Sequence, residues 1–339
     1  GKANPTDGVI GLLVKFGELK NTGGSAVVAV DHGTAMMATD GSTIENKTGA
    51  TVIATGKTDS SNRGSGNPVS NEPKATGENY GIVGISDTGY TYNIDPQGDL
   101  DNSVSIDHEG SSIYAAGDLA VGIYGENRHN AVKNKDGNVT IKFKNSAAGT
   151  TGIYVGNEEA ENKDTARGVG IALVNKSNLT TGAGTIELEG AGGDLADFAG
   201  TNTATANNMS PTLTLALGGN DIATGNNGIG IYAEDGTIKV NSDKFTVETK
   251  DNGVGLWGMD NTTVANGTKG KTFQYNYNGA KDKNGFAMAF GGKRNGNTIA
   301  SNDMDIVFTN VGDKTTPEKQ ISSHKNYTEA SWETSLWSV

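Results

Sequence analysis

The sequence contains no cysteine. This absence excludes a disulfide framework, a thiol nucleophile and a zinc site with cysteine ligands. The interior must therefore be held together by hydrophobic contacts and hydrogen bonds alone. A chain without thiols is also suited to export through a compartment in which disulfides form.

Basic residues are scarce. Lysine and arginine total 27 against 39 acidic residues, which gives a net charge of −12, and no basic cluster stands out. A protein that binds the phosphate backbone needs a basic patch or stripe. We therefore expect no nucleic-acid partner.

Long hydrophobic runs are missing as well. The apolar segment from Gly8 to Val14 is far shorter than the ~20 residues of a membrane-spanning helix, so we expect no membrane span in this chain. The sequence does not begin with Met and shows no signal peptide, which favours a mature or excised fragment.

Hydrophobic residues make up only 34% of the chain and charged residues 19%, whereas glycine accounts for 50 of the 339 residues. A typical globular domain is ~45–50% apolar when glycine is counted, with ~7% glycine. Low hydrophobicity and net charge also favour disorder, but the apolar residues of this chain alternate regularly, which disorder does not require. The composition favours a repeat protein that grows in one dimension without a single closed core.

A short phrase recurs along the chain. In its clearest form it is glycine, isoleucine or valine, glycine, isoleucine or leucine, and then an aromatic or small residue. Its copies begin at Gly8, Tyr80, Ala120, Thr150, Gly168, Gly228, Gly253 and Asn284. The spacing is loose, and the gap from Ile171 to Ile231 has room for two or more degenerate coils or a long insertion. We expect the aliphatic residues of the phrase to point inward and to line one shared column, which includes Ile123, Ile153, Ile231 and Leu256.

One unit contains three short segments with alternating apolar residues, separated by turns rich in asparagine, aspartate and glycine. Alternation with period two indicates strands with one buried face. The clearest set of pairs is Ile229/Ile231, Ile238/Val240 and Phe245/Val247. Three strands and three turns predict one triangular coil, and stacked coils bury what a single coil cannot. The predicted fold is all-β, a right-handed parallel β-helix (β-solenoid) with loop insertions.

Two competing repeat folds do not fit. A leucine-rich repeat needs more leucine and a helical half, and a propeller needs four-stranded antiparallel blades of ~40–50 residues.

Within the phrase, glycine is interpreted as a turn or bulge residue that requires positive φ, in preference to a site of close backbone approach. Asparagine and aspartate at the corners are expected to form turns and to stack as ladders.

The predicted β-helix segment spans residues 1–312, with polar insertions near 57–79, 126–138, 157–167 and 190–211. On a solenoid, insertions often collect on one side and form the binding face, although each single loop can equally be a surface loop without function. The candidate binding residues are Asn62, Arg63, Asn67, Glu72, Lys74, Arg128, His129, Glu158 and Glu159. Residues 313–339 lack the phrase and are expected to form a cap or to start another module, with room for a short helix from Glu329 to Leu336.

No catalytic motif is present, and the four histidines are far apart in the sequence, without metal-ligand spacing. A β-helix glycosidase would need two carboxylates within ~5–10 Å of each other. The pairs Asp303/Asp305 and Asp235/Asp260 are interpreted as turn residues instead. Segments beginning at Gly192 and Gly218 resemble calcium-binding nonapeptides, but these work only in tandem. We therefore predict no catalytic residue, no metal and no cofactor.

The phrases GIGIYAEDGTIKV, GVGLWGMDNTTV and AVGIYGEN closely resemble the passenger regions of large type V (autotransporter) outer-membrane adhesins, especially those of the fusobacterial type. The resemblance covers most of residues 8–312. It implies a long β-helix on the bacterial surface, where a C-terminal outer-membrane β-barrel of the full-length protein anchors it. The implied partners are host cell-surface proteins or glycans and other bacteria. The family offers no catalytic motif to carry over.

Two functions are therefore expected from the sequence. The first is a non-enzymatic cell-surface adhesin or stalk. The alternative is a carbohydrate-active β-helix enzyme or a protein that binds polysaccharide in the manner of a phage tailspike.

Overall fold

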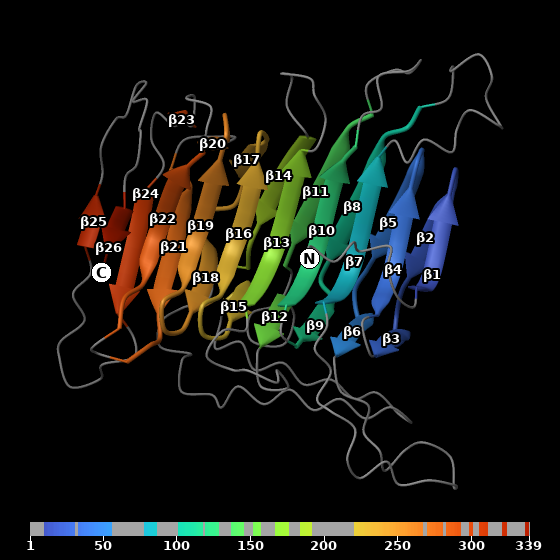
Figure 1. The fold of residues 1–339 in the computed structure, drawn as a ribbon, viewed down its shortest axis with the longest axis horizontal. Helices are drawn as coiled ribbons and strands as arrows, with labels where there is room; N and C mark the ends of the chain where they lie inside the picture. Colours follow the sequence, from blue (N-terminus) through green and yellow to red (C-terminus); the bar gives the residue numbers. More distant parts are fainter. Residues whose placement is uncertain are drawn as a thin grey trace, which may run out of the picture.

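The computed structural model describes residues 10–30, 33–55, 78–86, 101–117, 119–128, 137–145, 152–156, 167–175, 184–191, 220–266, 270–280, 283–292, 298–300, 305–310, 321–323 and 336–338. Every regular element in these ranges is a β-strand, and the strands form three sheets (Figure 1). The prediction of an all-β fold is confirmed.

Sheet A has nine strands, in the order β1 (Ile10–Lys15), β4 (Thr34–Thr39), β7 (Glu78–Ser86), β10 (Leu119–Asn127), β13 (Arg167–Asn175), β16 (Ile229–Glu234), β19 (Val254–Met259), β22 (Phe286–Gly291) and β26 (Leu336–Ser338). Sheet B has eight, in the order β2 (Glu18–Asn21), β5 (Ser42–Asn46), β8 (Val104–Glu109), β11 (Val139–Lys144), β14 (Gly184–Glu189), β17 (Thr237–Val240), β20 (Thr263–Asn266) and β23 (Thr298–Ala300).

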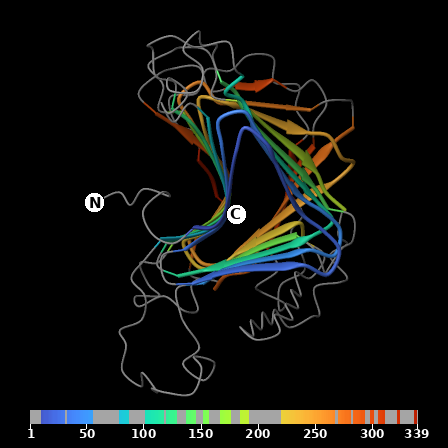
Figure 2. The ribbon, with the colours of Figure 1, turned by 90° about the vertical axis from the view of Figure 1, so that its right-hand side faces the viewer.

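Sheet C has nine strands, in the order β3 (Ala26–Val30), β6 (Thr51–Thr55), β9 (Ser112–Ala116), β12 (Gly152–Gly156), β15 (Ile222–Thr224), β18 (Phe245–Thr249), β21 (Thr272–Tyr277), β24 (Asp305–Asn310) and β25 (Ile321–Ser323). Through β24 the chain visits the sheets in the repeating order A, B, C, and all pairings among these strands are parallel. Viewed along the stack, successive coils superimpose on the three sides of a triangle (Figure 2). The three-strand unit predicted from the repeated phrase is confirmed, and the parallel stack of coils has the architecture of a β-solenoid.

The expected column of aliphatic residues is correct except for one member. Ile123, Ile231 and Leu256 lie on sheet A in direct register with neighbouring coils. Ile153 lies on sheet C, where it stacks between Ile113 and Ile222. Its placement with the others was wrong because a strand of sheet C happens to carry the same glycine–isoleucine–tyrosine sequence.

Only one member of each aliphatic doublet on sheet A points inward. Ile231 belongs to the central core cluster, whereas Ile229 does not. Likewise, Ile123 joins the core, while Val121 belongs to a separate cluster on the outer face. The regular pairing between coils skips the intervening glycine, so the alternation of the strand is interrupted there. The prediction that both residues point inward was therefore wrong for sheet A.

The glycine inside the phrase serves close packing. Gly122, Gly170 and Gly230 do not have positive φ, so the turn interpretation was wrong. A Cβ on any of them would lie 2.5–2.6 Å from the carbonyl oxygen of the stacked glycine in the next coil. Because that neighbour is backbone, a larger residue cannot be accommodated without moving the strand.

The long gap between Ile171 and Ile231 contains one coil. β13 stacks directly on β16, with Ile171 beside Ile231, and β14 and β15 complete the coil between them. Of the two alternatives expected for this gap, the additional coils were wrong, because β13 and β16 are direct neighbours, whereas the long insertion agrees with the extra chain outside the described residues.

Sheets A and C carry apolar residues on both faces. Outside the central core, a second cluster lies on sheet A and a third on sheet C, which contains the stacked rings of Tyr114 and Tyr154, 5.8 Å apart. The outer positions of sheet B are mostly polar instead. This difference gives the three sides of the solenoid distinct chemistry.

The last two strands run against the others. β25 pairs with β24 and β26 pairs with β22, both antiparallel. Leu336, expected at the end of a short helix, begins strand β26, and residues 329–335 lie outside the described residues. None of the described residues forms a helix that is long and apolar enough to cross a membrane.

Candidate functional site

The predicted insertions leave the solenoid at all three corners. Those near 57–79 and 157–167 leave between sheets C and A, that near 126–138 between sheets A and B, and that near 190–211 between sheets B and C. The expectation that they collect on one side was therefore wrong. Two coils separate the corners of the first pair, which corresponds to ~10 Å along the stack.

Most predicted binding residues fall on insertions that lie outside the described residues: Asn62, Arg63, Asn67, Glu72, Lys74, His129, Glu158 and Glu159. Arg128 is described, directly after β10. The end of the first insertion is also described, since Glu78 and Asn79 belong to β7. Asn79 is fully buried there, and its amide nitrogen donates to the carbonyl oxygen of Ala116.

Arg128 is held by a buried carboxylate. Its Nε donates to Oε1 of Glu126 at 2.6 Å and its Nη2 to Oε2 at 3.2 Å. The hydroxyl of Tyr124 donates to the same Oε2 at 2.9 Å. The side chain of Glu126 is inaccessible to solvent, so Arg128 neutralises a charge on the outer face of sheet A. A structural role explains its contacts better than the predicted role in a binding loop.

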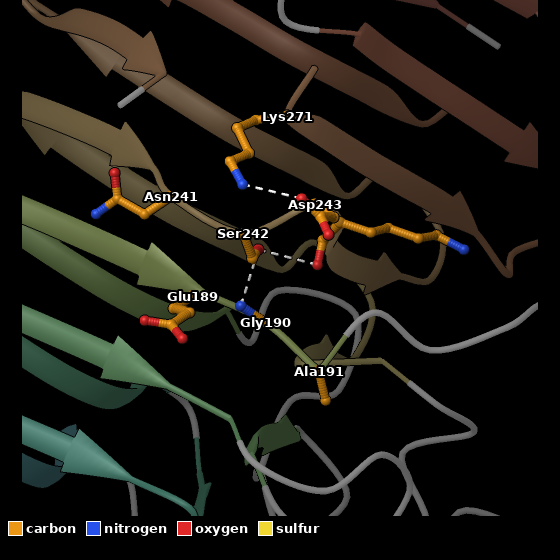
Figure 3. Close-up of a pocket in the computed structure, with 8 residues that line it drawn as sticks. Glu189, Gly190, Ala191, Asn241, Ser242, Asp243 and Lys271 are labelled. Atoms are coloured by element: carbon orange, nitrogen blue, oxygen red, sulfur yellow. Dashed lines mark hydrogen bonds and ion pairs between the residues drawn. The ribbon is translucent and has the colours of Figure 1, made fainter. Parts of the chain in front are cut away.

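A polar pocket of about 430 Å³ opens at the corner between sheets B and C (Figure 3). It is lined by residues from the end of β14, the turn between β17 and β18, and the segment before β21: Glu189, Gly190, Ala191, Asn241, Ser242, Asp243, Lys244 and Lys271. The lining contains no aromatic ring. The 190–211 insertion begins at this pocket.

The polar groups of the pocket largely bind one another. Lys271 donates from Nζ to Oδ1 of Asp243 at 2.9 Å, and Ser242 accepts the backbone N–H of Gly190 at 3.0 Å while it donates to the carbonyl oxygen of Lys244 (Figure 3). These contacts join three successive coils. The pocket offers hydrogen-bonding groups of both charges at its rim, which suits a polar ligand.

Beside this pocket, the buried carboxylate of Asp221 accepts four hydrogen bonds. Thr246 donates from its backbone N–H and its hydroxyl, Ala191 from its N–H, and Asn145 from its side-chain amide, all within 2.8–3.0 Å. Burial raises the pKa of Asp221, and the four donors oppose this by favouring the charged form. Asp221 belongs to the calcium-like segment that begins at Gly218. Since both of its oxygens are already occupied, it serves the packing of the three successive coils formed by β10–β12, β13–β15 and β16–β18.

Glu248 occupies a second buried polar cluster, on the outer face of sheet C. Asn220 and Asn278 donate their side-chain amides to its two carboxylate oxygens at 3.0 and 2.8 Å. Asn276 also donates to Asn220 at 2.8 Å. Burial raises the pKa of Glu248 to about 7, and the two amide donors limit the rise. Its carboxyl group therefore titrates near neutral pH.

Of the acidic residues predicted to lie in turns, Asp235 and Asp260 do so, whereas the prediction was wrong for Asp305. Asp235 and Asp260 both have positive φ, 55° and 42°, at equivalent corners between sheets A and B. Asp305 is in strand β24, and Asp303 lies outside the described residues. Among the described residues, no three histidine, aspartate or glutamate side chains gather in a way that could hold a metal ion.

The outer face of sheet B is an open polar surface. Its hydroxyl residues stack in register from coil to coil in one column: Thr43, Ser105, Thr140, Thr185, Thr237 and Thr263. Charged residues beside them pair across coils, such as Lys239 with Glu187 at 3.5 Å and Lys144 with Glu189 at 3.4 Å. Exposed pairs of this kind contribute little energy, roughly 0–1 kcal/mol each, but they favour the correct register.

No signal in the sequence pointed to the two buried carboxylates. Asp221 and Asn145 are 76 residues apart, and Glu248 looks like one more polar position on an alternating strand. No protein-family model, curated protein or solved structure matches the chain.

Proposed function

We propose that this chain is a rod-shaped segment of right-handed parallel β-helix from the exported passenger region of an autotransporter adhesin. It acts at the bacterial cell surface without catalysing a reaction. Its partners are host cell-surface proteins or glycans and other bacteria, which it contacts through the insertions at its corners.

The observation that carries this proposal is the uninterrupted stack of coils from which insertions leave at every corner. A stiff rod places such segments at fixed positions along its length. Many copies on one cell then add their weak contacts, because each further contact forms at a high effective concentration. The resemblance of the repeated phrase supports the assignment to the autotransporter passenger regions.

The right-handed sense of the proposed helix rests on the chirality of parallel strand connections. Such crossovers are right-handed in ~98% of cases, because of the twist of the strands. A circular-dichroism spectrum alone does not report this property, so an experimental structure is the direct test.

A binding assay tests the function. Beads coated with the chain are expected to bind host cells or partner bacteria saturably, and a glycan array identifies any carbohydrate ligand. Variants in which residues 57–77 or 157–166 are replaced by a short Gly-Ser linker should lose binding if these insertions carry it. A chain that binds none of these partners at any density would contradict the proposal.

The second candidate, a carbohydrate-active enzyme, is favoured by one observation. Burial raises the pKa of Glu248 to about 7, the range that suits a general acid, but the side chain is buried and both of its oxygens accept amide hydrogen bonds from Asn220 and Asn278. A reducing-end assay on polysaccharides decides between the two functions. Turnover that Glu248→Gln abolishes would establish the enzyme, whereas saturable binding without product supports the adhesin.

A further inference from the structure

His108 lies inside the solenoid. It points inward from β8 with no solvent exposure, and the register places it between Asn46 of β5 and Phe143 of β11. Its ring stacks on that of Phe143, with centroids 5.0 Å apart and planes 11° from parallel. The histidine thus occupies the boundary between a polar and an apolar part of one inward column.

A chain of hydrogen bonds determines how the ring is protonated. Asn21 donates its amide to the carbonyl oxygen of Thr51 at 3.3 Å and to Oδ1 of Asn46 at 3.0 Å. The amide nitrogen of Asn46 therefore faces Nδ1 of His108, at 3.1 Å. Because this nitrogen can only donate, Nδ1 must accept, and the ring proton resides on Nε2.

Nε2 of His108 has no hydrogen-bond partner among the described residues. A buried donor without an acceptor is unfavourable. The neighbouring coils show two residues that would avoid this cost, Asn46 before it and Phe143 after it. A histidine at this position is therefore expected to make the fold less stable than asparagine or phenylalanine would. Its presence favours a function that depends on its protonation.

The immediate surroundings of the ring are uncharged. Asn46, Phe143 and Ser111 face it from β5, β11 and the turn before β9, and none of these three side chains is charged. The charged groups that act on it are Asp107 and Lys47. Burial, with a smaller contribution from Lys47, lowers the pKa of His108 to about 4, against the influence of Ser111 and Asp107.

We propose that His108 is an acid-sensitive latch between the second coil (β4–β6) and the third coil (β7–β9). At neutral pH its Nδ1 accepts from Asn46 and joins the two coils. Protonation places a hydrogen on Nδ1, directly opposite the N–H of Asn46, and a charge among Asn46, Phe143 and Ser111, none of which carries a carboxylate. The contact must then break, and the two coils separate at this corner.

The variant His108→Asn tests the latch, because asparagine keeps an acceptor for Asn46 and cannot titrate. The measurement is the urea midpoint between pH 7.5 and 4, together with amide hydrogen exchange in β5 and β8. A variant in which His32, His129 and His324 are all changed to asparagine is the matched control, since it retains only His108.

We expect the wild type and the control to lose stability between about pH 6.5 and 4. The folding equilibrium should fall on the order of 100-fold relative to His108→Asn at pH 4, with early loss of protection in β5 and β8. Equal acid loss in His108→Asn, or its disappearance in the control, would overturn the proposal. Should His108→Asn fail to fold, exchange in the wild type decides the question, and acid-induced opening that begins elsewhere would refute the latch.

Discussion

Gly122 of sheet A lies directly against Ile153 of sheet C. A Cβ at position 122 would be 2.5 Å from Cγ2 of Ile153 and 2.6 Å from the carbonyl oxygen of Gly170 in the next coil. The glycine of the repeated phrase thus lets two sheets approach at the corner of the triangle and recurs because each coil repeats that approach.

Gly122→Ala is expected to destabilise the chain by about 1–3 kcal/mol or more, because overpacking a rigid site displaces backbone. Urea unfolding measures the loss. Gly17→Ala is the control, since its Cβ would meet only Val14 and Lys15 at 3.4 and 3.9 Å. Equal effects of the two substitutions would argue against close approach as the reason for the glycine.

Arg128→Ala should cost on the order of 3–5 kcal/mol, because it leaves the carboxylate of Glu126 buried without the guanidinium that neutralises it. The double variant Glu126→Gln/Arg128→Ala should recover a large part of this loss, since no buried charge remains. Lys20→Ala serves as the control. Its ion pairs with Glu18 and Glu45 are exposed, so we expect a change below about 1 kcal/mol. Failure of the double variant to recover stability would show that Arg128 acts through packing.

Glu248 should make the chain less stable as pH rises. Its pKa is about 7 in the folded state and 4.5 when it is free, so between these values the folded state binds the proton more tightly than the unfolded state. The stabilisation is fully present below about pH 4.5 and is lost as pH rises through 7. The free energy of unfolding should fall by on the order of 3 kcal/mol over this range.

Glu248→Gln, which resembles the protonated form, should remove this slope. The measurement is the urea midpoint from pH 5 to 8. His108 contributes with the opposite sign over part of the same range, so the comparison is made at each pH against wild type. A Glu248→Gln curve parallel to that of the wild type would contradict the shift.

Replacing residues 56–77 by a short Gly-Ser linker should leave the β-rich circular-dichroism spectrum and the melting temperature nearly unchanged. Extending the replacement through Asn79 should lower the melting temperature, because Asn79 is buried and bonded to Ala116 and to the backbone N–H of Gly33. Collapse of the fold in the shorter replacement would place that segment in the core.

The sequence predicted the local structure correctly where strands alternate without interruption. The pairs Ile238/Val240 and Phe245/Val247 all point into the core, as their spacing indicates. Asparagine stacking at the corners was also predicted correctly, as Asn21 and Asn46 show. The candidate binding residues could not be placed in the same way, because a polar insertion has no periodicity that fixes its position.

By itself, the sequence determined the three-strand coil, since side-chain alternation and turn residues are local properties. Only the tertiary structure decided which copies stack on which. Neighbouring coils contact each other through residues 25 positions apart in Asn21–Asn46 and 62 apart in Asn46–His108, so sequence distance does not identify the partner. The buried hydrogen bonds of Asp221, Glu248 and His108 form only when the coils stack. The removal of water from these side chains cannot be inferred from the sequence of a single strand.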